Sequence, residues 1–141
     1  ERGVRAEAVA NAFLAGADIL VDVLPLTDET RDLLNRARLA KLPAGSHLIN
    51  VGRGGTIVDD DLLALLDAGH LAGAVLDVFR TEPLPPEHPF WHHPKVIVTP
   101  HLSGPTPREP AARQIAEAIA ALEGGAAPES LAGCVDRARG Y

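Results

Sequence analysis

The chain has 141 residues, of which 46% are hydrophobic and 23% charged, as expected for one soluble globular domain. Its net charge of −6 argues against a general nucleic-acid surface, and no stretch is long and apolar enough to cross a bilayer. We therefore expect no nucleic-acid or membrane partner. The single cysteine, Cys134, excludes an internal disulfide framework, so a reducing cytoplasm is the expected location.

Apolar runs typical of strands alternate along the chain with patterns typical of helices. The expected strands span residues 19–24, 46–51, 72–79 and 95–99. The expected helical segments span residues 8–15, 27–42 (one or two short helices), 62–66 and 105–122, the last with Ala112, Ile115, Ala116, Ile119 and Leu122 on one face. This alternation predicts α/β organisation, with a parallel sheet covered on both faces.

Three consecutive acids, Asp59, Asp60 and Asp61, precede the apolar helical run at 62–66. Acidic side chains at this place can cap free amide groups and meet the positive end of the helix dipole. Metal binding is the alternative, but adjacent residues on one turn point in different directions. We therefore expect capping.

Arg53, Glu82 and His101 each lie in a loop that follows an apolar run. A guanidinium can grip a carboxylate at two points, an imidazole can exchange a proton at neutral pH, and a carboxylate can orient that imidazole. Glycine on both sides of Arg53 suits close approach of a ligand to the backbone. Together the three residues suit reduction of a 2-keto acid.

Each of these residues also has a structural interpretation when taken alone. Arg53 could be a surface arginine after a glycine turn, His101 a structural histidine before a helix, and Glu82 a solvated acid in a proline-rich loop. His88, His92 and His93 cluster in the same proline-rich loop, which lacks a cysteine and a helical His-Glu-x-x-His arrangement. We therefore expect no metal site there.

Four motifs in this order resemble the later part of a D-isomer-specific 2-hydroxyacid dehydrogenase. They are residues 24–30 (LPLTDET), 48–59 (around Arg53), 76–85 (LDVF through EPLP) and 99–101 (TPH). The catalytic candidates are 29 and 19 residues apart, and the likeness covers nearly the whole chain. Residues 85–94 and 135–141 look most like the glyoxylate and hydroxypyruvate reductase branch.

The resemblance implies roles for the three catalytic candidates. Arg53 would bind the substrate carboxylate and polarise its carbonyl. His101 would donate a proton to the carbonyl oxygen, and Glu82 would fix the imidazole and stabilise its charged form.

The resemblance also implies residues that contact the cofactor: Leu24, Pro25, Thr30, Gly52, Arg53, Asp77, Ser103 and Gly104. The first three would lie beside the adenine ribose or pyrophosphate, and the last two near the nicotinamide. Asp77 would meet the nicotinamide carboxamide. The alternative for Asp77 is a side chain at a strand end that accepts bonds from backbone amides.

No Gly-x-Gly-x-x-Gly turn occurs in the chain, and Gly52-Arg53-Gly54-Gly55 does not replace it. The expected fold is therefore the second half of a Rossmann-type doubly wound parallel sheet, an incomplete dinucleotide-binding domain. Residues 1–125 would belong to that domain, and residues 126–141 would form a tail docking on a missing substrate domain. The absence of Met, with Glu1 first, favours a fragment over processing of a short N-terminal stretch.

The sequence thus predicts part of an oxidoreductase that transfers hydride from NAD(P)H, with a leaning to NADPH, to a small 2-keto acid such as glyoxylate or hydroxypyruvate. The full-length protein would be a homodimer, and the fragment alone would turn over little. A corepressor-like NAD(H) sensor on the same fold is the alternative, and an inactive breakdown product is a third.

Overall fold

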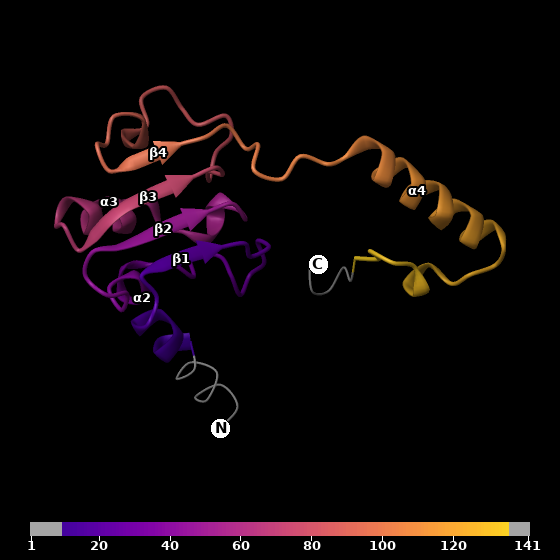
Figure 1. The fold of residues 1–141 in the computed structure, drawn as a ribbon, viewed down its shortest axis with the longest axis horizontal. Coiled ribbons are helices and arrows are strands. Elements are labelled where there is room, and N and C mark those ends of the chain that lie inside the picture. Colours follow the sequence, from indigo (N-terminus) through magenta and orange to yellow (C-terminus); the bar gives the residue numbers. More distant parts are fainter. Residues whose placement is uncertain (1–9, 136–141) are drawn as a thin grey trace. The chain divides into compact units, whose positions relative to one another are not determined.

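The computed structural model describes residues 10–135 (Figure 1). Contacts between residues divide the chain into two compact units, the first ending at Ser103 and the second beginning at Gly104. The division after residue 125 into a cofactor domain and a tail stays a prediction. The expected helix start at residues 8 and 9 and the ending 136–141 lie outside the described residues.

A four-stranded parallel sheet forms the centre of the first unit, with the strands in the order β1-β2-β3-β4 (Figure 1). The strands are β1 (Ile19–Asp22), β2 (Ser46–Asn50), β3 (Leu71–Leu76) and β4 (Val96–Val98). This confirms the α/β class and the four predicted strands, each of which ends one to three residues earlier than predicted. Because all four strands are parallel, the loops after them meet at one edge of the sheet.

Helical residues 10–15 precede β1, helix α2 (Arg36–Leu39) lies between β1 and β2, and helix α3 (Asp59–Asp67) lies between β2 and β3. Short 3₁₀ turns lie at η1 (Gly54–Thr56) and η2 (Pro89–Trp91). The predicted helical segment 27–42 was too long, because only α2 is helical there. Asp32 has a left-handed φ of 55°, and Leu34 pairs with Ile57 as an isolated β-bridge, so the backbone leaves helical geometry before residue 36.

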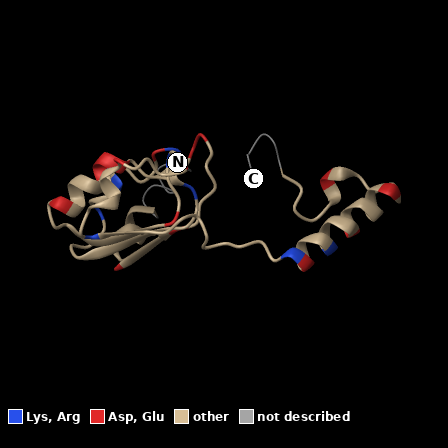
Figure 2. Cartoon of the chain, turned by 90° about the horizontal axis from the view of Figure 1, so that it is seen from above, with Lys and Arg blue, Asp and Glu red and all other residues tan. Residues whose placement is uncertain are grey.

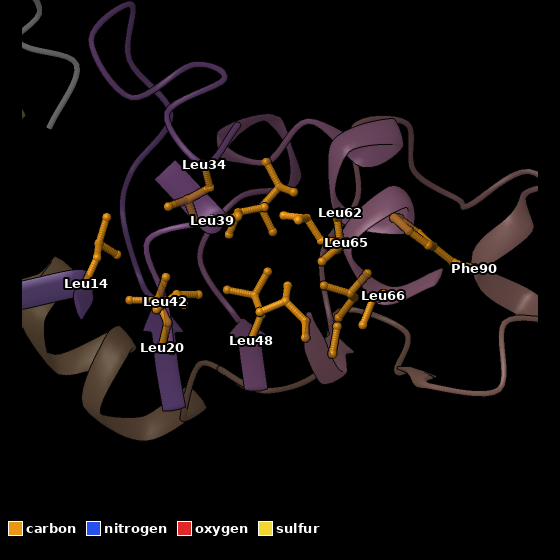
Figure 3. Close-up of a cluster of buried hydrophobic side chains, with 14 of the residues drawn as sticks. Leu14, Leu20, Leu34, Leu39, Leu42, Leu48, Leu62, Leu65, Leu66 and Phe90 are labelled. Atoms are coloured by element: carbon orange, nitrogen blue, oxygen red, sulfur yellow. The ribbon is translucent and has the colours of Figure 1, made fainter. Parts of the chain in front are cut away.

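A leucine-rich core packs between one face of the sheet and the helices (Figure 3). The largest fully buried apolar side chains are Leu39, Leu42, Leu48, Leu62, Leu66, Leu71 and Leu76. Each buried leucine contributes roughly 1.5–3 kcal/mol relative to an exposed one. This layer holds the strand ends, and hence the loops after them, in fixed positions.

The opposite face of the sheet carries Ile19, Val21 and Ile97, which are all half exposed or more. Figure 2 shows the helices of the first unit on one side of the sheet. Within the first unit, residues 10–103, the helices therefore cover one face of the sheet, and cover on the other face stays a prediction.

The aspartates before 62–66 lie in the first turn of α3, as predicted, but they do not cap it. Val58 is the N-cap residue and gives no side-chain hydrogen bond. The Oδ2 of Asp61 instead accepts a 2.8 Å bond from the backbone amide of Arg36, and Asp59 pairs with Arg80 and His88. Their bonds therefore tie α3 to other segments.

The second unit contains helix α4 (Arg108–Glu123) and the short turn η3 (Pro128–Ser130). Ile115, Ile119 and Leu122 of the predicted apolar face are exposed, and no residue of α4 is buried. Within the described residues, no helix combines the length and the apolarity needed to cross a membrane.

Candidate active site

A pocket of about 410 Å³ lies among the loops that follow β1, β2, β3 and β4. It is lined by Leu26, Arg31, Arg53, Gly54, Gly55, Phe79, Arg80, Glu82 and His101. The three catalytic candidates, which lie far apart in the sequence, therefore share one pocket. Their catalytic roles stay predictions.

His101 and Glu82 form a hydrogen-bonded pair, with 2.7 Å between Nδ1 and Oε2. The other carboxylate oxygen, Oε1, accepts a 2.9 Å bond from the backbone amide of Phe79. The bond from His101, helped by that from Phe79, holds the pKa of Glu82 below its usual value. An ionised Glu82 keeps a proton on Nδ1 of His101, so Nε2 is the nitrogen that can exchange a proton with a ligand.

Arg53 has an extended backbone, with φ −142° and ψ 135°, and its Nη1 donates a 2.7 Å bond to the carbonyl of Gly52. Among residues 10–135, no carboxylate lies within 4.0 Å of its guanidinium. The remaining donors can therefore bind a ligand carboxylate through a two-point contact.

The glycines around Arg53 are required by contacts between loops, and close approach of a ligand to them stays a prediction. A Cβ on Gly54 would lie 1.9 Å from the backbone carbon of Phe79, and one on Gly52 would lie 2.8 Å from the amide nitrogen of Leu24. Real Cβ atoms do not come so close to backbone. The close approach at Gly54 brings the Arg53 loop against the loop that carries Glu82.

A buried polar network fixes the backbone of Arg53. Asn50, at the end of β2, donates a 3.2 Å bond to the carbonyl of Arg53 and accepts a 3.0 Å bond from the amide of Gly52. The hydroxyl of Thr56 lies 2.7 Å from the same carbonyl and also contacts the carboxylate of Asp22, at the end of β1. Asn50 directly, and Asp22 through Thr56, thus fix the backbone of the Arg53 loop from the ends of two neighbouring strands.

We expect Thr56→Val to lower the free energy of unfolding by about 1–3 kcal/mol, because it leaves the buried Asp22 carboxylate short of a donor. Urea denaturation of the chain measures this. Thr81→Val, the same change at an exposed residue, should alter stability by less than about 0.5 kcal/mol. Equal midpoints for the two variants would show that the network contributes nothing.

Asp77 lies beneath the His101 loop and is only 1% exposed. Its carboxylate contacts the hydroxyl of Thr99 and accepts bonds from the amides of Leu102 (3.1 Å) and Ser103 (2.9 Å). Its carbonyl accepts the amide of His101 at 2.9 Å, and His101 has a left-handed φ of 51°. Asp77 thus accepts bonds from backbone amides at a strand end, as its structural alternative predicts. Contact of Asp77 with a nicotinamide carboxamide stays a prediction.

Burial alone would raise the pKa of Asp77, but the bonds from Thr99, Ser103 and Leu102 outweigh it and hold the pKa below the usual 3.8. The folded chain therefore gains stability from Asp77 above about pH 4 and loses it as the pH falls toward the lower folded pKa.

We expect Asp77→Asn to be less stable than the parent chain at pH 7 and to lose less stability between about pH 4 and pH 2. Thermal unfolding over that range measures both effects. Asp18→Asn, at an exposed position, is the matched control. A variant whose unfolding follows the parent's pH dependence would contradict this role for Asp77.

The loop after β1 carries Leu24, Pro25 and Thr30 together, but its polar groups bond within the loop. The amide of Leu24 donates to Asp22 at 2.9 Å, and the hydroxyl of Thr30 donates to the carbonyl of Pro25 at 2.6 Å. The backbone amides of Gly52 and Ser103 likewise donate to side chains, those of Asn50 and Asp77. Gly104 begins the second unit, so it is not placed with the pocket.

Arg31 and Arg80 also line the pocket, and sequence reasoning missed both. Arg80 contacts Asp32 and the carbonyl of Ile57, and its Nε lies 3.7 Å from Asp59. Burial raises the pKa of Asp59, against the opposing charges of Arg80 and His88. Nothing in the pattern around either arginine marked it.

The loop histidines make pairwise contacts. His88 lies 3.5 Å from Asp59, and His93 lies 3.3 Å from Asp67. In the part of the chain that the structure describes, no three His, Cys, Asp or Glu side chains are arranged to hold a metal ion.

The fold defines this chain as part of a Rossmann-type domain, with the pocket among the loops at the carboxyl edge of a parallel sheet. Residues 1–103 match the family described as D-isomer specific 2-hydroxyacid dehydrogenase, NAD binding domain. The chain belongs to this family.

Solved structures of longer proteins resemble the chain. A D-isomer specific 2-hydroxyacid dehydrogenase from Xanthobacter autotrophicus Py2, in complex with NADPH and MES, is 46% identical over 95% of this chain and 54% of its own, with a TM-score of 0.89. An NADPH-dependent glyoxylate/hydroxypyruvate reductase from Sinorhizobium meliloti, with NADP and sulfate, is 42% identical over 95% of this chain and 43% of its own, with a TM-score of 0.87. The chain thus spans about half of these proteins or less.

Proposed function

We propose that the full-length protein reduces a small 2-keto acid, with glyoxylate or hydroxypyruvate as substrate, to the 2-hydroxy acid. The observation that carries this proposal is that Arg53 and the hydrogen-bonded pair of His101 and Glu82 line one pocket. The guanidinium of Arg53 suits the carboxylate of a 2-keto acid, and the imidazole of His101 suits the carbonyl next to that carboxylate.

In this proposal the guanidinium of Arg53 binds the substrate carboxylate and draws charge toward the carbonyl oxygen. NAD(P)H, when bound, would supply the hydride that the carbonyl carbon accepts, and would leave as NAD(P)⁺. Nε2 of His101 gives a proton to the carbonyl oxygen, so the carbon–oxygen double bond becomes a single bond as one C–H and one O–H bond form. Glu82 stabilises the imidazolium before the transfer and keeps the ring oriented after it.

The carboxyl edge of the sheet offers surface that suits the flat rings of a dinucleotide. Leu24 and Leu26 are each 37% exposed in the loop after β1, and Leu102, next to His101, is 59% exposed. Apolar side chains left open beside a polar pocket are typical of ligand sites. We assign adenosine-side contacts to the first two and nicotinamide-side contacts to Leu102.

NADPH is the proposed reductant, supported by the NADPH and NADP named with the Xanthobacter and Sinorhizobium proteins. This chain supplies no Gly-x-Gly-x-x-Gly turn, so the cofactor's pyrophosphate would be held by sequence outside these 141 residues. The homodimer and the cytoplasmic location remain predictions.

The test is turnover by the full-length gene product. NADPH and NADH oxidation would be followed with glyoxylate, hydroxypyruvate and pyruvate. We expect turnover of the first two, with a higher kcat/KM for NADPH than for NADH. Cofactor-dependent association without turnover of any 2-keto acid would instead support a sensor and defeat the proposal.

A further inference from the structure

The pocket carries more positive charge than one carboxylate requires. Of its three arginines, Arg80 is paired with Asp32 and Asp59. Neither Arg53 nor Arg31 has a carboxylate within 4.0 Å among residues 10–135. The acid of the pocket, Glu82, is engaged by His101. Two guanidinium groups therefore face the pocket without an acidic partner in the described residues.

The backbone on both sides of the Arg31 side chain is anchored, although the side chain itself is exposed. The amide of Arg31 donates a 2.9 Å bond to the carbonyl of Thr27, and the next amide, that of Asp32, donates a 3.0 Å bond to the carbonyl of Gly55. The second bond ties Arg31 to the loop that carries Arg53. The two arginines come from different strand ends, after β1 and β2, and so form separate parts of the pocket lining.

The volume of the pocket also exceeds the need of a two-carbon acid. Glyoxylate has five non-hydrogen atoms, and at roughly 30 Å³ each, the share of a water molecule in the liquid, it occupies about 150 Å³. The pocket measures about 410 Å³. This leaves space for the four further non-hydrogen atoms of a longer acid such as oxaloacetate.

We propose that Arg31 binds a second anionic group on the substrate, so that the pocket favours 2-keto acids with a distal carboxylate over monocarboxylic ones. Arg53 takes the carboxylate next to the reacting carbonyl, and Arg31 takes the far one. This inference rests on the proposed function, because it requires His101 to donate a proton to the carbonyl that lies between the two carboxylates. A cofactor phosphate is the other anion that Arg31 could meet, and the experiment separates the two.

The experiment compares Arg31→Gln with the parent in the full-length gene product. KM is measured for oxaloacetate, a 2-keto dicarboxylate, and for glyoxylate, and the Kd of NADPH is measured separately. Arg31→Gln should raise the KM for oxaloacetate by about tenfold or more, as expected for loss of a hydrogen-bonded charge pair. The KM for glyoxylate and the Kd of NADPH should change by less than about twofold. Arg36→Gln, the same change at an exposed residue outside the pocket, should alter none of these values.

A binding measurement gives a readout that does not depend on turnover. By calorimetry with NADP present, the parent should bind tartronate, a 2-hydroxy dicarboxylate, more tightly than glycolate, and Arg31→Gln should remove that preference. The inference fails if the parent shows no preference, if both acids weaken equally, or if the Kd of NADPH rises instead. If the parent reduces no 2-keto acid at all, the proposed function fails as well, whereas turnover of glyoxylate without these effects defeats only the role of Arg31.

Discussion

Replacing His101 with asparagine should lower kcat for 2-keto acid reduction in the full-length protein by about 10²–10⁴-fold. The imidazole is the proton donor of the proposed reaction, and asparagine cannot supply a proton to an alkoxide. Because His101 touches Glu82 through Nδ1 and lies at the surface of the pocket, the change removes little packing. KM should therefore change far less than kcat.

His92→Asn is the matched control, because His92 is exposed in the loop before β4 and does not line the pocket. Its kcat should equal that of the parent. The dependence on His101 is measured by steady-state kinetics under saturating NADPH. If His101→Asn kept more than a tenth of the parent's kcat, the assignment of the proton donor would be wrong.

Replacing Arg53 with lysine should lower kcat/KM by about 10²–10³-fold, although the positive charge is kept. Lysine places one compact ammonium where the guanidinium offers a planar fork, so the two-point grip on the carboxylate and the polarisation of the carbonyl are both lost. The bond from Nη1 to the carbonyl of Gly52 is lost as well. A rise in KM together with a fall in kcat is expected.

Arg36→Lys serves as the control for Arg53→Lys, since Arg36 is exposed and outside the pocket. Binding of oxamate, an unreactive analogue of a 2-keto acid, gives a readout free of chemistry. Its affinity should fall in Arg53→Lys and stay unchanged in Arg36→Lys. Equal oxamate affinity and equal kcat/KM in parent and Arg53→Lys would remove Arg53 from the site.

The sequence alone predicts the parts of this molecule that repeat a simple pattern. The apolar runs around Leu20, Leu48, Ala74 and Ile97 became the four parallel strands. A parallel arrangement places the ends of all strands at one edge, which is why Arg53, Glu82 and His101 could be expected to converge from their places after such runs.

Other features depend on contacts that no local pattern reveals. Gly54 is needed because the backbone of Phe79 comes against it, a contact between segments 25 residues apart. Asp61 bonds Arg36 across a similar separation, so its expected capping role was wrong. Arg31 is one exposed arginine in a turn, and only the folded chain shows that it lines the pocket.

Polar residues at the ends of three strands could have predicted more of the site than was inferred from the sequence. Asp22 and Asn50 are the last residues of β1 and β2, Asp77 directly follows β3, and all three are buried in the structure. The first two accept the amide of the residue two positions on, and Asp77 accepts those of Leu102 and Ser103. A buried acid or amide at the end of a strand must find donors, so these positions could have been assigned to support of the loops.

The most direct measurement is a crystal structure of the full-length protein with NADP and oxamate bound. The oxamate carboxylate should lie within hydrogen-bond distance of the Arg53 guanidinium, with its amide carbonyl oxygen, which stands in for the substrate carbonyl oxygen, on Nε2 of His101. Oxamate bound away from these two side chains, with the pocket between them open, would contradict the account.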